Sequence, residues 1–120
     1  ILTATDKTYG YVPGRTTIGA EFINGFYQVG GLFGKTYEIV YIGSIKENGA
    51  AYKAGLRKED IIISVTANGT TTNIEDAATI RQIIESQEVG DTIVFKVKRG
   101  NLNGPEIEFS VTCEQYIYTI

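Results

Sequence analysis

The side chains that catalyse hydrolysis in most enzymes are sparse in this sequence and form no reactive pattern. Histidine, the commonest general base, is absent from all 120 residues. Ser44, Ser64 and Ser86 therefore have no histidine to activate them, and no serine–lysine arrangement is evident. Asp and Glu residues fall mostly in expected turns and on outward faces, without the paired carboxylates of acid–base catalysis. The sequence predicts a fragment that is not itself an enzyme.

Cys113 is the single cysteine, which excludes a disulfide framework and a cysteine-rich metal site. Its place in an alternating stretch puts it on the same face as Ile107, Phe109 and Val111. A thiol on a core face acts as a small buried hydrophobe rather than as a nucleophile. We therefore expect no catalytic residue, no cofactor and no metal.

Charge and hydropathy exclude several classes of partner. The formal net charge is −3 with both signs scattered, so no basic stripe is present for nucleic acid or anionic lipid. No apolar run approaches the roughly 20 residues of a membrane-spanning helix. The chain has neither a signal peptide nor an initiator Met, and we expect it to be part of a longer protein.

Hydrophobic periodicity predicts a mainly β fold with one short and one long helix. The strands are expected at residues 16–23, 38–45, 61–65, 92–99 and 106–113. Residues 92–99 alternate, with Ile93, Phe95 and Val97 expected to face inward. The long helix is expected over 73–85, with Asn73 as its N-cap. Its apolar residues form a stripe on one face, and Thr79, Arg81, Gln82 and Glu85 are expected to face outward. Pro13-Gly14 predicts a turn at the entry to the domain. Residues 24–36 are rich in glycine and predict a long loop, with a glycine-kinked hairpin as the alternative.

The short helix lies in the most informative stretch of the chain. It reads Ala50-Ala51-Tyr52-Lys53-Ala54-Gly55-Leu56, then Glu59-Asp60-Ile61-Ile62, then Asn68-Gly69. Gly55 predicts a left-handed helix stop, and the isoleucines predict a strand buried on both faces. This pattern of Ala-Gly-Leu, a polar turn ending in Asp, an apolar strand and Asn-Gly resembles the PDZ domain of HtrA-type serine proteases. The resemblance covers most of the chain, from residue 15 to 112, and matches least over 24–36.

The resemblance implies an α+β, mainly β fold: a partly open antiparallel barrel or sandwich of five to six strands, of the circularly permuted bacterial type. It also implies a peptide groove between a strand and the long helix. Ile18, Gly19 and Ala20 would bind the terminal carboxylate, although Thr17 replaces the aromatic residue of the family pattern. Residues 20–23 would pair with the peptide backbone. The implied site residues are Thr17, Ile18, Gly19, Ala20, Glu21, Phe22, Ile80, Ile83 and Ile84.

The implied function is recognition of C-terminal or extended peptides with an apolar last residue, by strand addition. The parent chain would be an extracytoplasmic serine protease whose substrate binding or regulation uses this domain. A scaffold or adaptor PDZ domain of a cell-envelope complex, or the PDZ domain of another processing protease, stays open as the alternative. Residues 1–14 are expected to form an arm or linker, 15–115 the domain and 116–120 a tail. The tail, with Tyr118 to Ile120 at its end, is itself a candidate ligand for weak head-to-tail self-association.

Overall fold

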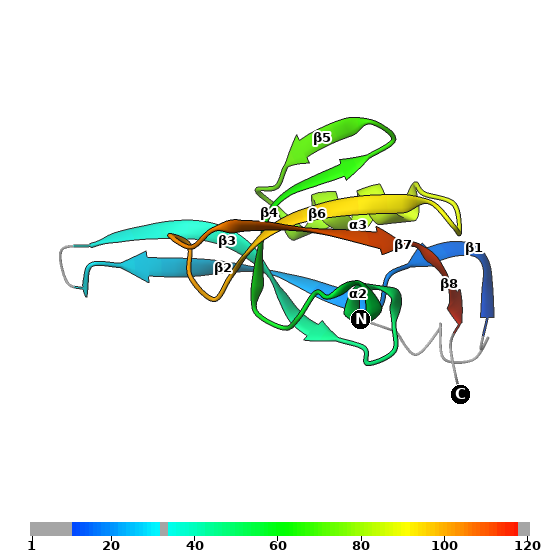
Figure 1. Ribbon diagram of the computed structural model, residues 1–120, viewed down its shortest axis with the longest axis horizontal. Coiled ribbons are helices and arrows are strands. Elements are labelled where there is room, and N and C mark those ends of the chain that lie inside the picture. Colours follow the sequence, from blue (N-terminus) through cyan, green and yellow to red (C-terminus); the bar gives the residue numbers. More distant parts are fainter. Residues whose placement is uncertain (1–10, 32–33, 118–120) are drawn as a thin grey trace.

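Two open antiparallel sheets and two helices make up the described part of the chain (Figure 1). The computed structural model describes residues 11–31 and 34–117. The larger sheet has six strands in the order β2-β3-β4-β6-β7, with β5 paired to β4, and the smaller sheet pairs β1 with β8. The element bounds are β1 (Tyr11–Thr17), β2 (Ala20–Val29), β3 (Lys35–Ile45), α2 (Ala50–Ala54), β4 (Asp60–Ala67), β5 (Thr70–Asn73), α3 (Ala77–Glu85), β6 (Thr92–Arg99), β7 (Glu106–Thr112) and β8 (Glu114–Ile117). The predicted mainly β fold with one short and one long helix is confirmed, with more strands than the five to six expected.

A single core lies between the larger sheet and the two helices, and the predicted alternation along β6 accounts for its centre. Ile93, Phe95 and Val97 are completely buried. The ring of Phe95 stacks on that of Phe22 from β2, with centroids 5.9 Å apart. Cys113 is buried as expected. Aromatic and aliphatic residues from strands distant in sequence thus meet near the start of β2, at Phe22.

The short helix α2 and the strand after it follow the sequence prediction closely. Gly55 ends α2 in the left-handed conformation, with φ of 113°, and Leu56 packs back into the core with no exposed surface. In β4, the residues from Asp60 to Val65 are buried on both faces of the strand except Ile63, which is half-buried. Asn68 and Gly69 both have positive φ, 54° and 78°, as a two-residue turn between antiparallel strands requires.

The long helix begins later than the sequence predicts. α3 starts at Ala77, and its N-cap is Asp76, whose carboxylate accepts a hydrogen bond of 2.8 Å from the N–H of Ala78. Asn73, the predicted cap, is instead the last residue of β5 and pairs with Ser64 of β4. The prediction was wrong because pairing with a buried strand outweighs the local capping preference of Asn73.

The glycine-rich segment is a long hairpin, which was the alternative to the predicted loop. β2 and β3 pair without interruption from Phe22 opposite Ile42 to Val29 opposite Lys35. A side chain of the opposite strand covers Gly25: the position where Gly25 would carry a Cβ lies 2.6 Å from the ring of Tyr41. This contact replaces the missing side chain and lets glycine occupy a strand.

The turn predicted at Pro13-Gly14 is also wrong, because both residues lie within β1. The register between β1 and β8 shifts between Tyr11 and Thr16, and such an irregularity is where an edge strand accommodates proline. The tail residues Tyr118 to Ile120 lie outside the described residues.

Candidate functional site

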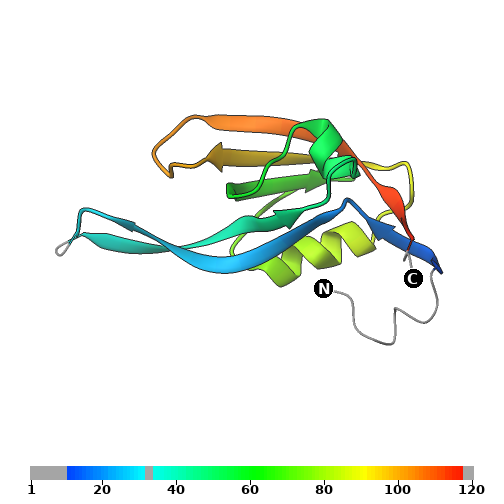
Figure 2. The ribbon, with the colours of Figure 1, turned by 90° about the horizontal axis from the view of Figure 1, so that it is seen from below.

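Helix α3 lies beside β2 and runs antiparallel to it (Figure 2). Three hydrogen bonds fix the alignment. At the helix start, the N–H of Ala77 donates to Oδ1 of Asn24 at 2.8 Å. At the helix end, the hydroxyl of Thr16 in β1 donates to the carbonyl of Gln87 at 2.7 Å. The last turn of α3 therefore lies opposite the loop that joins β1 to β2.

The third contact crosses from the middle of the helix to the strand. Nη1 of Arg81 donates to the main-chain carbonyl of Phe22 at 3.1 Å. β2 is a terminal strand of the sheet within the described residues, so its outer edge is open to a further strand. Arg81 thus binds a main-chain acceptor of the strand that an added peptide would pair with.

The loop at Ile18 and Gly19 has its carbonyls held on one side. The carbonyl of Ile18 accepts from the N–H of Ala51 in α2, and that of Gly19 accepts from the N–H of Lys46, both at 2.8 Å. In a trans peptide the N–H points opposite to the C=O. The N–H groups of Gly19 and Ala20 are therefore directed away from α2. Gly19 adopts φ of 74°, which permits this sharp bend.

Thr17 has a specific role in that loop. Its hydroxyl oxygen accepts a hydrogen bond of 3.2 Å from the N–H of Gly19. A side-chain oxygen thus occupies a position where an anionic ligand oxygen would accept from the same amide. A carboxylate accepts such a bond more strongly than a hydroxyl does, so it would replace Thr17 as the acceptor.

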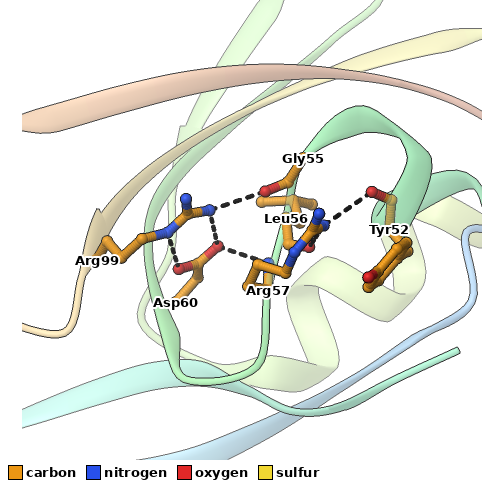
Figure 3. A network of polar contacts seen from close by, with 6 residues as sticks. All are labelled: Tyr52, Gly55, Leu56, Arg57, Asp60 and Arg99. Carbon is orange, nitrogen blue, oxygen red and sulfur yellow. Dashed lines mark hydrogen bonds and ion pairs between the residues drawn. The ribbon is translucent and has the colours of Figure 1, made fainter. Parts of the chain in front are cut away.

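The network in Figure 3 holds α2, and with it the loop, against the sheet. Asp60 is fully buried, and its carboxylate accepts from Nε and Nη2 of Arg99 at 2.8 and 2.9 Å and from the N–H of Arg57 at 2.8 Å. Arg99 also donates to the carbonyl of Gly55 at the end of α2. The pKa of Arg99 is raised, chiefly by its hydrogen bond to Asp60. Asp60, the Asp residue of the sequence motif, therefore positions α2. The first turn of α2 in turn holds the loop through the hydrogen bond from Ala51 to Ile18.

A cavity of about 600 Å³ borders the same loop. Its walls include Thr17, Gly19 and Lys46 on one side and Cys113 on another. Burial raises the pKa of the Cys113 thiol to about 11, with a further contribution from the charge of Asp91. The thiol is therefore protonated at neutral pH, which makes it a poor nucleophile.

The structure brings most of the predicted site residues together at the start of β2. Ile18 and Phe22 are buried there, Thr17, Gly19, Ala20 and Glu21 are half-buried, and Oε1 of Glu21 accepts a hydrogen bond from Ser44 at 3.2 Å. From the helix, Ile80 is completely buried in the core and Ile84 is 6% exposed.

Ile83, the third predicted helix residue, is half-buried and packs against the core. It lies two positions after Arg81, about 200° further around the helix, so the two side chains leave the helix on different faces. Sequence reasoning placed Arg81 on the outer face and assigned Asn24 to a loop, so it missed both residues that contact across α3 and β2. No local signal marks either one, because their partners are distant in sequence.

Comparison with known proteins agrees with this architecture. A family model described as "PDZ domain" matches residues 17–112. The chain belongs to the PDZ family. Its domains receive peptides as an added strand, with pockets for alternate side chains. The matched span includes the loop, the edge strand and the helix described above.

Two curated relatives carry the name "Serine protease Do-like HtrA". The protein from Lactobacillus helveticus is 33% identical over 75 residues, which is 62% of this chain and 16% of the relative. The protein from Bacillus subtilis (strain 168) is 32% identical over 106 residues, which is 85% of this chain and 22% of the relative. The chain thus spans about a fifth of the length of these relatives.

A similar solved structure is the PDZ domain of a carboxy-terminal protease from Vibrio cholerae, crystallised in complex with a peptide. The TM-score is 0.59 at 16% sequence identity, covering 80% of this chain and 98% of the other. At this identity the likeness supports the fold alone.

Two further findings concern residues 11–31 and 34–117. No helix in this part is long and apolar enough to cross a membrane. The same part contains no group of three or more His, Cys, Asp or Glu side chains placed to hold a metal ion.

Proposed function

We propose that this PDZ domain is the substrate-recognition or regulatory domain of an HtrA-type serine protease, and that it binds C-terminal or extended peptides as an added strand on β2. The observation that carries the proposal is the loop before β2. The carbonyls of Ile18 and Gly19 are hydrogen-bonded to Ala51 and Lys46, so the N–H groups of Gly19 and Ala20 point away from these two residues. They lie beside an open strand edge. Converging main-chain amides of this kind bind carboxylates.

The ligand would run antiparallel to β2, because its carboxylate would lie at the start of the strand. The last side chain would then enter the space between the start of β2 and the last turns of α3. Such a side chain would meet residues that belong to the core or pack against it, and their apolar character favours an aliphatic last residue: Ile18, Ala20, Phe22, Ile80 and Ile84. Burying one such side chain contributes about 1.5–3 kcal/mol, and we expect affinities in the micromolar range, about −8 kcal/mol.

The ligand would have to displace two internal contacts. The carboxylate would take the N–H of Gly19 from the hydroxyl of Thr17. The ligand strand would compete with Arg81 for the carbonyl of Phe22. Lys46, which lines the cavity beside the loop, adds a positive charge that favours an anionic chain end.

The remainder of the proposal rests on the named relatives. A PDZ domain is a binding module, so hydrolysis would belong to another part of the parent chain. The parent would be an extracytoplasmic, envelope-associated serine protease, in which this domain selects exposed protein C termini or regulates the protease. Comparing the full-length protein with a variant lacking residues 17–112 tests this role. We expect the deletion to alter cleavage of unfolded proteins, and unchanged cleavage would contradict it.

Peptide titration tests the site itself. A pentapeptide ending in Val with a free carboxylate should bind with micromolar Kd, and its C-terminal amide should bind at least about tenfold more weakly, since charged hydrogen bonds contribute about 1.5–3 kcal/mol. A peptide ending in Asp serves as the control for the apolar pocket. Equal affinity of the acid and the amide would contradict the proposed carboxylate site. A preference for the peptide ending in Asp would contradict the proposed apolar pocket.

A further inference from the structure

The outer half of β2, residues 25–29, carries an exposed aromatic residue on the face that α3 covers nearer the start of the strand. Side chains of alternate residues point to the same face of a strand. Phe22 packs in the core on this face, and Asn24 reaches the start of α3. The next residue of the series is Phe26, which is 74% exposed. Figure 2 shows the hairpin of β2 and β3 extending past the first turn of α3. Asn24 contacts the first residue of the helix, and Phe26 follows two positions later in β2.

The register of a bound peptide places one ligand residue beside Phe26. A chain end at the loop and an antiparallel direction put the last ligand residue opposite Ala20. Each step back along the ligand then advances one residue along β2, so the residue six positions before the last lies opposite Phe26. Directly opposed residues project to the same face, with Cβ atoms about 4.5–5.5 Å apart.

The strand itself continues far enough for this contact. β2 is a terminal strand of the sheet in the described part of the chain, and it pairs with β3 through Val29. An added strand could therefore pair with β2 beyond the first turn of α3. At that distance from the loop the helix no longer contributes a wall, and Phe26 is the large apolar side chain that remains on this face.

We propose that Phe26 forms a second binding subsite, which takes a large apolar or aromatic side chain six residues before the C terminus of the ligand. This inference rests on the function proposed above, and its occupant is the upstream stretch of the same bound peptide. The subsite would make the domain select ligands by two separated apolar residues: the last one and one that lies beyond the helix.

The test compares three peptides with the same last five residues, ending in Val. One is the pentapeptide alone, and two are octapeptides with either Phe or Ser six positions before the last residue. We expect the Phe octapeptide to bind about fivefold or more tightly than the Ser octapeptide, from burial of one aromatic contact. The Ser octapeptide should bind at most slightly more tightly than the pentapeptide.

Matched variants locate the contact. Phe26→Ser should abolish the advantage of the Phe octapeptide and leave binding of the pentapeptide unchanged. Tyr37→Ser is the control: Tyr37 is 43% exposed on the same hairpin but pairs with Tyr27, which places it on the opposite face. This variant should retain the advantage. Both positions are exposed, so neither substitution is expected to unfold the domain.

The outcomes separate this inference from the proposed function. Equal binding of the two octapeptides, with the pentapeptide still bound, overturns the subsite and leaves the peptide site intact. Loss of the advantage in Tyr37→Ser as well as Phe26→Ser also overturns it. If Phe26→Ser changes sedimentation of the free domain rather than peptide affinity, the face joins copies of this chain and the subsite is wrong. If none of the peptides binds, both proposals fail.

Discussion

The two halves of β2 belong to one strand but are held by different kinds of contact. Residues 20–24 lie beside α3, and the loop before them is fixed by hydrogen bonds to α2 and to Lys46. Residues 25–29 extend past the helix and are held by β3, with the ring of Tyr41 lying over Gly25. The loop end is thus fixed by tertiary contacts, and the hairpin end mostly by cross-strand contacts.

This difference bears on how the strand could recognise a ligand. At the loop end the amides are oriented before any peptide arrives, so less ordering opposes binding there. At the hairpin end the strand offers an extended edge and the exposed Phe26, without a wall of helix. We expect the loop end to set the position of the ligand and the hairpin end to add affinity for longer peptides.

The largest expected effect is at Asp60, which secures the loop end through α2. Asp60→Asn keeps the shape but removes the charge that Arg99 and the N–H of Arg57 bind. Asp60 is fully buried but the Arg99 side chain is 44% exposed, so we expect a loss of about 3 kcal/mol in unfolding free energy, the lower end of the range for a buried pair. Denaturant unfolding measures the loss. Hydrogen exchange should show greater opening of residues 18–20 than of residues 25–29.

Glu106→Gln is the matched control for Asp60→Asn. Its carboxylate lies 3.7 Å from Nζ of Lys96, and the two side chains are 46% and 36% exposed. Exposed pairs contribute about 0–1 kcal/mol, so this variant should unfold close to the wild type. A similar loss of stability in both variants would show that the Asp60 network does not hold the loop end.

The second effect uses the dry environment of Cys113 beside the loop end. Its folded pKa is raised to about 11, above the ordinary value of 9.0, so the folded state retains a proton that the unfolded state releases. The contribution of the thiol to stability is therefore complete below about pH 9 and is lost as the pH rises towards 11, by about 2 kcal/mol. The comparison is the unfolding free energy of wild type and Cys113→Ala at several pH values. Parallel pH profiles would show that the thiol is as solvated in the folded chain as in the unfolded one.

The sequence carried enough information for the loop end but not for the hairpin end. Gly55, Leu56 and the alternation along β6 are local patterns, and each gave the correct element. The hairpin was only the alternative to a loop, because the partner that makes Gly25 acceptable in a strand is Tyr41, and glycine-rich composition alone favours a loop. The start of α3 was missed for the same reason, since Asn73 pairs with a strand that precedes it.

The candidate site divides in the same way. The residues of the loop could be named from the family motif, because the motif is continuous in sequence. The face of α3 beside β2 could not, since an amphipathic stripe shows which residues are buried but not which strand lies next to each. Arg81 therefore seemed to be a solvent-facing residue, whereas the structure places its guanidinium on Phe22.

The third effect separates backbone geometry from packing in the loop. Gly19→Ala places a Cβ 3.4 Å from Cα of Gly49, an ordinary contact, so the cost comes from φ of 74° and is about 1–2 kcal/mol. We also expect weaker binding of C-terminal peptides, because the strained loop would reorient its amides. Gly69→Ala is the control, since φ is 78° there and the surroundings are open. Gly69→Ala should lower the unfolding free energy by a similar amount and leave peptide affinity unchanged. An equal loss of affinity in the two variants would show that the loop at Gly19 is not part of the binding site.

The smallest effect lies at the boundary between the two halves of β2, where Arg81 occupies the carbonyl of Phe22. If a ligand strand must displace this contact, Arg81→Ala removes a competitor whose hydrogen bond contributes about 0.5–1.5 kcal/mol, and peptide affinity should rise about threefold. Gln82→Ala, at the exposed neighbouring position, should leave the affinity unchanged. A fall in affinity for Arg81→Ala would mean that the guanidinium contacts the peptide instead of competing with it. In that case the boundary would attract the ligand, and the loop end and the hairpin end would form one continuous site rather than two sites divided by an internal hydrogen bond.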